Sequence, residues 1–134
     1  MARIIDVEGI GPHFAGRLRA IGVATTERLL VVAAHPQGRK DLAEQSGITE
    51  KLILEWANLA DLMRIKGIGP EYGDLLEEAG VDTVRELRTR RPEALHQAAK
   101  EINLRKRLVR RVPSLREIER WVAEAKRLKP LLTY

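Results

Sequence analysis

Two short glycine turns are the stretches of this chain whose residue types and spacing suggest chemistry. They are 58 positions apart and share one pattern: Gly9-Ile10-Gly11 and Gly67-Ile68-Gly69. A proline follows each turn, and proline suits the first position of a helix. Backbone amides at the start of a helix bind anions, and glycine leaves room for close approach. The pattern therefore predicts two candidate anion sites.

The charged neighbours of the two turns differ. The first turn is followed by three side chains that suit a phosphate: His13, Arg17 and Arg19. The second turn has Lys66 before it, but the helix after it carries four carboxylates: Glu71, Asp74, Glu77 and Glu78. Because like charges oppose an anion, we expect the first turn to bind phosphate and the second to be a structural copy. The alternative is that both turns only form tight helix crossings.

A basic block in the last third of the chain is the second candidate site. Residues 83–134 carry 15 Lys and Arg against 6 Asp and Glu, a net charge of +9, whereas residues 1–60 carry 7 of each. Five cations of this block lie within residues 103–113: Arg105, Lys106, Arg107, Arg110 and Arg111. Such a surface suggests a polyanionic partner. The alternative is a solvated segment whose cations pair with nearby acids.

The sequence does not indicate a catalytic, metal or cofactor site. The chain has no cysteine, and its three histidines lack the spacing of metal ligands. No local stretch supplies a nucleophile with a base or a clustered pair of carboxylates. Trp56 and Trp121 stand at helical core spacing, so we expect both indoles to be buried. We therefore expect a protein that is not an enzyme and needs no cofactor.

The elements that position these residues are expected to be helical throughout. Apolar residues recur at helical spacing, and no stretch alternates as a strand does. Thr25, Thr49, Thr83 and Ser114 are expected N-caps of helices, the last two within capping boxes. We expect the helix that Thr25 caps to end at residues 35–38. A short helix is expected over residues 41–45 and a later one over residues 92–102.

The repeated turn divides the chain into two similar halves. We expect a first repeat over residues 1–61 and a second over 62–134, joined by one long central helix that begins near residue 49 and runs into the second turn. The two tryptophans are 65 positions apart, whereas the turns are 58 apart, so the second repeat is 7 residues longer. The extra residues fall in the basic segment near 103–113.

The turns and their flanks resemble the helix-hairpin-helix motif. The matching residues are Val7, Gly9, Ile10, Gly11 and Ala15, then Ile65, Gly67, Ile68, Gly69 and Gly73. Each half also looks like the N-terminal DNA-binding domain of RecA-like recombinases. The whole chain looks most like a bacterial domain-of-unknown-function family of tandem helix-hairpin-helix repeats. The resemblance implies two five-helix, SAM-like repeats that contact phosphates without reading bases.

These observations predict sequence-independent nucleic-acid binding, with DNA favoured over RNA, through the first turn and the C-terminal basic surface. The alternative is a protein-interaction or scaffold module, with an unidentified protein partner, in which both turns are structural. No apolar run reaches the roughly 18 residues of a membrane helix, and the first residues do not read as a leader. We therefore expect a cytoplasmic protein with no membrane partner. The oligomeric state stays open.

Overall fold

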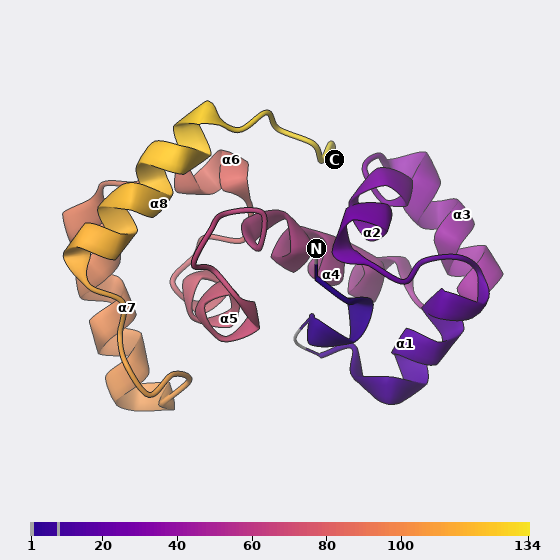
Figure 1. Ribbon diagram of the computed structural model, residues 1–134, viewed down its shortest axis with the longest axis horizontal. Helices are drawn as coiled ribbons and strands as arrows, with labels where there is room; N and C mark the ends of the chain where they lie inside the picture. The colour runs from indigo at the N-terminus through magenta and orange to yellow at the C-terminus, as the bar shows by residue number, and fades with distance from the viewer. Residues whose placement is uncertain (1, 8) are drawn as a thin grey trace. The chain divides into compact units, whose positions relative to one another are not determined.

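The computed structural model describes residues 2–7 and 9–134, and the regular secondary structure of these residues is helical (Figure 1). The elements are the 3₁₀ helix η1 (Ile4–Asp6) and the α-helices α1 (Gly11–Ala20), α2 (Thr26–Val32), α3 (Pro36–Ser46), α4 (Glu50–Leu62), α5 (Pro70–Glu78), α6 (Val84–Leu87), α7 (Pro92–Lys106) and α8 (Leu115–Arg127). The prediction of an all-α fold is confirmed. No helix in the described residues is long and apolar enough to cross a membrane.

The described chain forms two compact units. Unit 1 comprises residues 1–61 and 131–134, and unit 2 comprises residues 62–130. Unit 1 contains η1 to α4 except for the last residue of α4, and unit 2 contains α5 to α8. Each unit buries its own apolar side chains, so the candidate site residues of a unit are positioned by that unit's core.

The long helix expected from residue 49 ends sooner than predicted. Thr49 caps α4, since its Oγ1 accepts a hydrogen bond from the amide of Leu52 at 3.2 Å. The helix stops at Leu62. The amides of Ile65 and Ile68 then donate to the carbonyl oxygens three residues earlier, at 3.1 Å each. In these tight turns the side chains of Ile65 and Ile68 are buried, at 1% and 4% exposure. The turns take the place of the last helical turns that were predicted.

Helix α3 begins where the sequence predicted a helix end. Pro36 occupies its first turn and His35 is its extended N-cap, so residues 35–38 open a helix instead of closing one. Gly38 permits this arrangement because a Cβ there would overlap the carbonyl oxygen of Val32 and lie 3.3 Å from its carbonyl carbon. The short helix expected over residues 41–45 is therefore the second half of an 11-residue helix.

Residues 131–134 pack within unit 1. The amide of Thr133 donates to the carbonyl oxygen of Ala34 at 2.8 Å. The buried guanidinium of Arg39 donates to the carbonyl oxygens of Thr133 at 2.8 Å and Ala34 at 3.3 Å. Arg39 also lies over the ring of Tyr134, 5.7 Å from its centroid. Arg39 of α3 is therefore the centre of the contacts that hold this tail.

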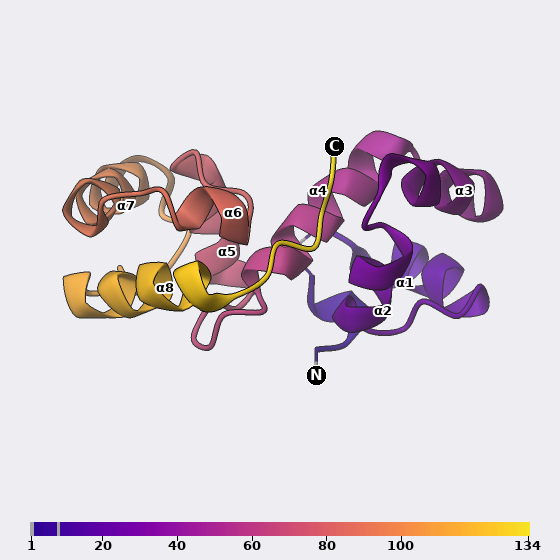
Figure 2. The ribbon, with the colours of Figure 1, turned by 90° about the horizontal axis from the view of Figure 1, so that it is seen from above.

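Unit 2 contains helices α7 and α8 side by side (Figure 1, Figure 2). The capping box predicted at the start of α8 is present, since the Oγ of Ser114 accepts a hydrogen bond from the amide of Glu117 at 3.1 Å. In return, the carboxylate of Glu117 accepts one from the amide of Ser114 at 2.9 Å. Thr83 caps α6 by accepting a hydrogen bond from the amide of Glu86 at 3.1 Å. The capping box predicted there is only half formed, since the carboxylate of Glu86 accepts from Nη2 of Arg90 at 3.4 Å instead of from the amide of Thr83.

Helix α7 runs further than predicted and ends at Lys106. Arg105 and Lys106 therefore belong to its last turn, and Arg107 follows as a cap with a left-handed φ of 49°. Asn103 closes the loop after the helix. Its side-chain amide donates to the carbonyl oxygen of Val109 and its side-chain oxygen accepts from the amide of Val109, both at 3.0 Å. The basic segment is therefore partly helix and partly a hydrogen-bonded loop.

Candidate nucleic-acid interface

The first glycine turn precedes α1 and lies over the indole of Trp56. Gly9 has a φ of 91°, and a Cβ there would lie 3.5 Å from Nε1 of Trp56. The amide of Ile10 donates to the carbonyl oxygen of Val7 at 3.2 Å, and the Ile10 side chain is 1% exposed. Ile10 therefore anchors the turn, and amides for an anion must come from its neighbours. Gly11 is one of these, exposed at the start of α1.

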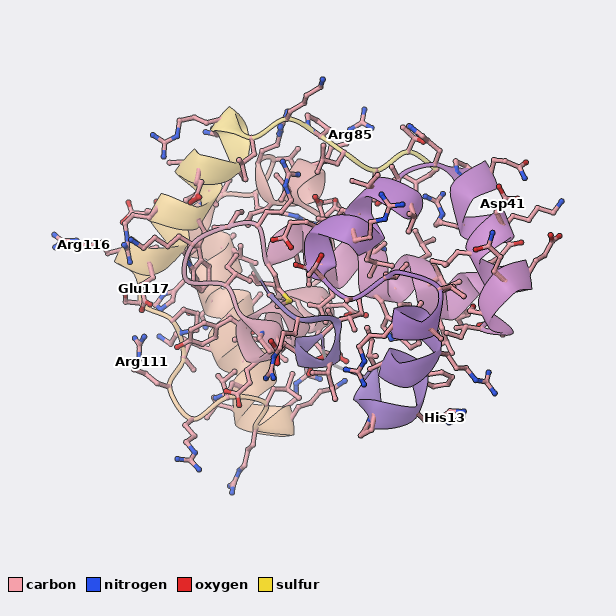
Figure 3. All side chains as sticks on the ribbon, turned by 45° about the vertical axis from the view of Figure 1, so that its right-hand side comes forward. His13, Asp41, Arg85, Arg111, Arg116 and Glu117 are labelled. Carbon is pink, nitrogen blue, oxygen red and sulfur yellow. The ribbon has the colours of Figure 1, made fainter. Side chains whose placement is uncertain are left out.

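The basic residues of α1 are distributed around the helix. His13 is exposed and lies at the outer edge of α1 in Figure 3. Arg17 is four residues further and shares the face of His13, since 3.6 residues make a turn. Nη1 of Arg17 lies 3.5 Å from the place that a Cβ would take at Gly47, the left-handed cap of α3. Arg19 lies about 160° around the helix from Arg17. The structure thus groups His13 with Arg17 and separates Arg19 from both.

The second glycine turn is built like the first but meets its helix differently. Gly67 has a φ of 96°, and a Cβ there would lie 3.1 Å from Nε1 of Trp121. The amide of Ile68 donates to the carbonyl oxygen of Ile65 at 3.1 Å. Gly69 is the extended N-cap of α5, with a φ of −99°, whereas the matching glycine of the first turn has a φ of 62°. The two tryptophans are 3% and 2% exposed, so the prediction of buried indoles is confirmed.

The acids that follow the second turn face cations of the basic segment. The carboxylate of Glu78 accepts a hydrogen bond from Nζ of Lys106 at 2.6 Å. Burial raises the pKa of Asp74, the charge of Glu78 raises it further, and the charge of Lys106 lowers it. Glu71 lines a hollow of about 560 Å³ together with Arg110. The acidic face of α5 is therefore partly neutralised within unit 2.

The five cations of the basic segment divide into two that are paired and three that are not. Lys106 pairs with an acid of α5, and Arg111 donates to both carboxylate oxygens of Glu117, at 2.7 and 3.0 Å (Figure 3). The hydroxyl of Tyr72 donates to the carbonyl oxygen of Arg111 at 2.9 Å. Three exposed side chains have no acid within ion-pair distance among the described residues: Arg105, Arg107 and Arg110.

The pKa of Glu117 predicts a pH-dependent contribution to stability. Hydrogen bonds from Arg111 and from the backbone of Ser114 lower the pKa of Glu117 from 4.5 to about 2. Because the pKa is lowered in the folded state, this contribution is complete above pH 4.5 and disappears as the pH falls towards 2. We expect Glu117→Gln to melt below the wild type at pH 7, and the two melting temperatures to converge between pH 4.5 and 2 in calorimetric scans. A difference that stays constant with pH contradicts this assignment.

A cationic hollow that the sequence did not predict lies beside the second turn. It measures about 190 Å³ and is lined by Lys66, Arg120, Trp121, Ala123, Glu124 and Arg127. Lys66 comes from the turn, and the other lining residues come from α8. Arg116 of α8 is exposed on the face of Arg120 and points outward in Figure 3. The spacing of the α8 arginines is a signal in the sequence, but only the structure places that face beside Lys66.

The two units differ in charge. Unit 1 has 7 Lys and Arg against 8 Asp and Glu, a net charge of −1, and unit 2 has 17 against 11, a net charge of +6. The first turn belongs to unit 1, whereas the second turn, the basic segment and α8 belong to unit 2. The described residues contain no group of three His, Cys, Asp or Glu side chains that could hold a metal ion.

Comparison with known protein families gives a match over most of the chain. A family model described as "Domain of unknown function (DUF4332)" matches residues 8–128. The matched region includes both glycine turns, the basic segment and the whole of α8. No curated protein and no solved structure matches the chain.

Proposed function

We propose a function from the side chains of the two units, since the chain belongs to the family described as domain of unknown function (DUF4332) and that description assigns no activity. The protein binds nucleic acid, with DNA favoured over RNA, through phosphate contacts that carry no base information. It does so without catalysing a reaction. Its contacts are the first glycine turn and the basic surface of unit 2.

The geometry of the turns supports a tandem helix-hairpin-helix architecture with repeats over residues 1–61 and 62–134. In both turns the amide of the central isoleucine donates to a carbonyl oxygen three residues earlier, at 3.2 Å for Ile10 and 3.1 Å for Ile68. An aromatic ring of the following helix packs on the indole beneath each turn. The ring centroids are 5.2 Å apart for Phe14 and Trp56, and 5.5 Å apart for Tyr72 and Trp121. Matching residues thus make matching contacts, as expected of two copies of one unit.

The observation that carries the proposal is the charge of unit 2. Its net charge is +6, and Arg105, Arg107 and Arg110 are exposed without an ion-pair partner among the described residues. A guanidinium group donates two parallel hydrogen bonds to a phosphate and stays charged at any physiological pH. Each phosphate that such a cation neutralises releases counterions, which is the main source of sequence-independent affinity. Unit 2 therefore has the chemistry of a phosphate-backbone binder.

The first turn contributes through backbone groups more than through side chains. The start of α1 has the positive end of the helix dipole, and exposed Gly11 and His13 stand there. Gly9 and Ile10 give the turn its shape. Arg17 is directed towards the end of α3, and Arg19 stands on another face, so we assign both smaller contributions than His13. The first turn is therefore proposed as a single phosphate contact.

A protein-interaction module remains the alternative, and the structure weakens the observation that favoured it. That observation is the acidic face around Glu71 and Asp74 beside a basic face, a polarity suited to self-association or to a charged partner. Glu78 is paired with Lys106, so part of this face is used within unit 2. Nucleic-acid binding is supported by cations that are exposed and unpaired in the described part of the chain, and we therefore prefer it.

Fluorescence anisotropy with labelled duplexes tests the proposal. We expect two DNA duplexes of unrelated sequence to bind with affinities within about threefold of each other, because phosphate contacts carry no base information. Replacing Arg105, Arg107 and Arg110 together by glutamine should weaken binding on the order of 100-fold at 150 mM salt. A charge-matched control replaces three exposed cations of unit 1 by glutamine: Arg28, Lys40 and Lys51.

Two results would contradict the proposal. One is an absence of duplex binding at micromolar protein and low salt, in which case concentration-dependent assembly in light scattering would favour the protein-interaction module. The other is an equal loss of affinity in the basic-segment variant and the unit 1 control, because that would assign binding to total charge and not to this surface.

A further inference from the structure

One face of α8 carries a row of exposed arginines with a gap in it. Arg120 lies four residues and Arg127 eleven residues beyond Arg116, so the three fall within about 40° of one another around the helix. At 1.5 Å per residue the row is about 16 Å long. Ala123 is exposed on the same face between Arg120 and Arg127. The short alanine side chain leaves a notch between two long cationic ones.

This notch opens on the cationic hollow beside the second turn. Lys66 borders the hollow from the turn, while Arg120 and Arg127 border it from α8. Glu124 also lines it, and its carboxylate accepts a hydrogen bond from the amide of Lys66 at 3.5 Å. Three cations and one acid give the lining a charge of +2. The hollow therefore has the charge and the guanidinium donors that a phosphate group requires.

The other acids of α8 do not cancel this charge. Glu117 pairs with Arg111 at 2.7 Å and does not line the hollow. Glu119 is exposed and lies about 40° around the helix from Ala123, but it does not line the hollow. Lys126 adds another exposed cation at the end of the helix. The cations Lys66, Arg116, Arg120, Lys126 and Arg127 thus outnumber the acids Glu119 and Glu124 beside them.

We propose that this face binds the phosphodiester backbone of duplex DNA. We name it the α8 row and define it by Lys66, Arg116, Arg120, Ala123 and Arg127. The inference rests on the proposed function and adds a third contact, separate from the first turn and from the basic segment. The second turn then takes part in binding, since its Lys66 contacts the phosphate that occupies the notch. Arg116 contacts a further phosphate of the same DNA backbone.

The α8 row suits a duplex better than a single strand. A duplex carries roughly one charge per 1.7 Å of its axis, so the roughly 16 Å of duplex beside the row carries on the order of ten phosphates, counted over both strands. Single-strand binders stack bases on exposed aromatic rings. The α8 row has no exposed aromatic ring among its residues, because Trp121 of α8 is buried and Tyr72, whose ring packs on Trp121, belongs to α5. The row therefore offers charge without a stacking platform.

Salt-dependent anisotropy on three proteins tests this inference. The wild type is compared with a row variant, Arg116→Gln/Arg120→Gln/Arg127→Gln, and with a control of equal charge change elsewhere in unit 2, Arg85→Gln/Arg91→Gln/Lys100→Gln. We expect the row variant to lose on the order of 100-fold in duplex affinity at 150 mM salt, and its salt slope to fall by about 2 to 3. The control should lose less than about tenfold. All three proteins should show the same helical circular dichroism.

A substitution in the notch gives a second readout that does not remove any cation. Ala123→Glu places a carboxylate between Arg120 and Arg127, whereas Ala123→Gln adds the same bulk without charge. Because Ala123 is an exposed helical residue, neither change disturbs the core. We expect Ala123→Glu to bind duplex at least about tenfold more weakly than Ala123→Gln, since a carboxylate repels the phosphate.

The outcomes separate this inference from the function on which it rests. If the wild type binds no duplex, the proposed function itself is contradicted. If the wild type binds duplex but the row and control variants lose affinity equally, or Ala123→Glu equals Ala123→Gln, the α8 row is overturned while the proposed function stands. Tighter binding of a single strand or of an RNA duplex than of a DNA duplex of the same length would overturn the assignment to duplex DNA.

Discussion

Replacing Gly38 by alanine is expected to destabilise unit 1 by about 2 kcal/mol, although alanine favours helices more than glycine does. The added Cβ would overlap the carbonyl oxygen of Val32. That oxygen belongs to the backbone at the end of α2, so it cannot turn away as a flexible side chain can. The start of α3 must therefore shift, and the contacts of Arg39 shift with it.

Gly16 offers a matched control for this experiment, because it is a helical glycine of the same unit. A Cβ at Gly16 would meet no described atom within 4 Å beyond its own helix turn. Gly16→Ala should therefore stabilise the protein by about 0.5 to 1 kcal/mol. Urea unfolding followed by circular dichroism measures both. Equal effects of the two substitutions would contradict the close approach of α3 to Val32.

Replacing Arg39 by methionine is expected to destabilise unit 1 by about 3 kcal/mol, because three carbonyl groups lose a charged donor. The guanidinium is 6% exposed and donates to Ala33 at 2.9 Å, Ala34 at 3.3 Å and Thr133 at 2.8 Å. Methionine fills similar volume but donates no hydrogen bond. The neighbouring Lys40 is exposed, so Lys40→Met is the matched control and should change stability by less than about 0.5 kcal/mol.

The same substitution should also release the tail. In the wild type the amide of Thr133 is hydrogen-bonded to Ala34 at 2.8 Å, which protects it from hydrogen exchange. We expect Arg39→Met to raise the exchange rate of this amide more than that of amides within α4. Unchanged protection of Thr133, together with a loss of stability, would show that Arg39 supports α3 but does not hold the tail.

Local rules in the sequence predicted most helices and several of their starts. Thr25, Thr49, Thr83 and Ser114 each accept the hydrogen bond expected of an N-cap. The role of a proline is ambiguous in a sequence, because proline can mark either the end of one helix or the start of the next. At Pro36 the choice was decided by the fit of Gly38 against α2, a contact between elements that periodicity does not contain.

The candidate site was less predictable than the fold, because ion pairs and hollows join residues that are distant in sequence. Lys106 and Glu78 are 28 positions apart, and their pairing changes the charge of both the basic segment and the acidic helix. The arginine spacing on α8 is visible in the sequence. Its value as a site depends on Lys66, which reaches the same hollow from a different element.

The salt dependence of duplex binding shows most directly whether the protein binds the phosphate backbone. If six or more phosphates are neutralised by the basic surface, the affinity of the wild type should fall on the order of a thousandfold between 50 and 200 mM salt. The plot of log affinity against log salt should be linear, and two duplexes of unrelated sequence should give the same slope. An affinity that does not change over this range, or no binding at 50 mM salt, would contradict the claim that the protein is a phosphate-backbone binder.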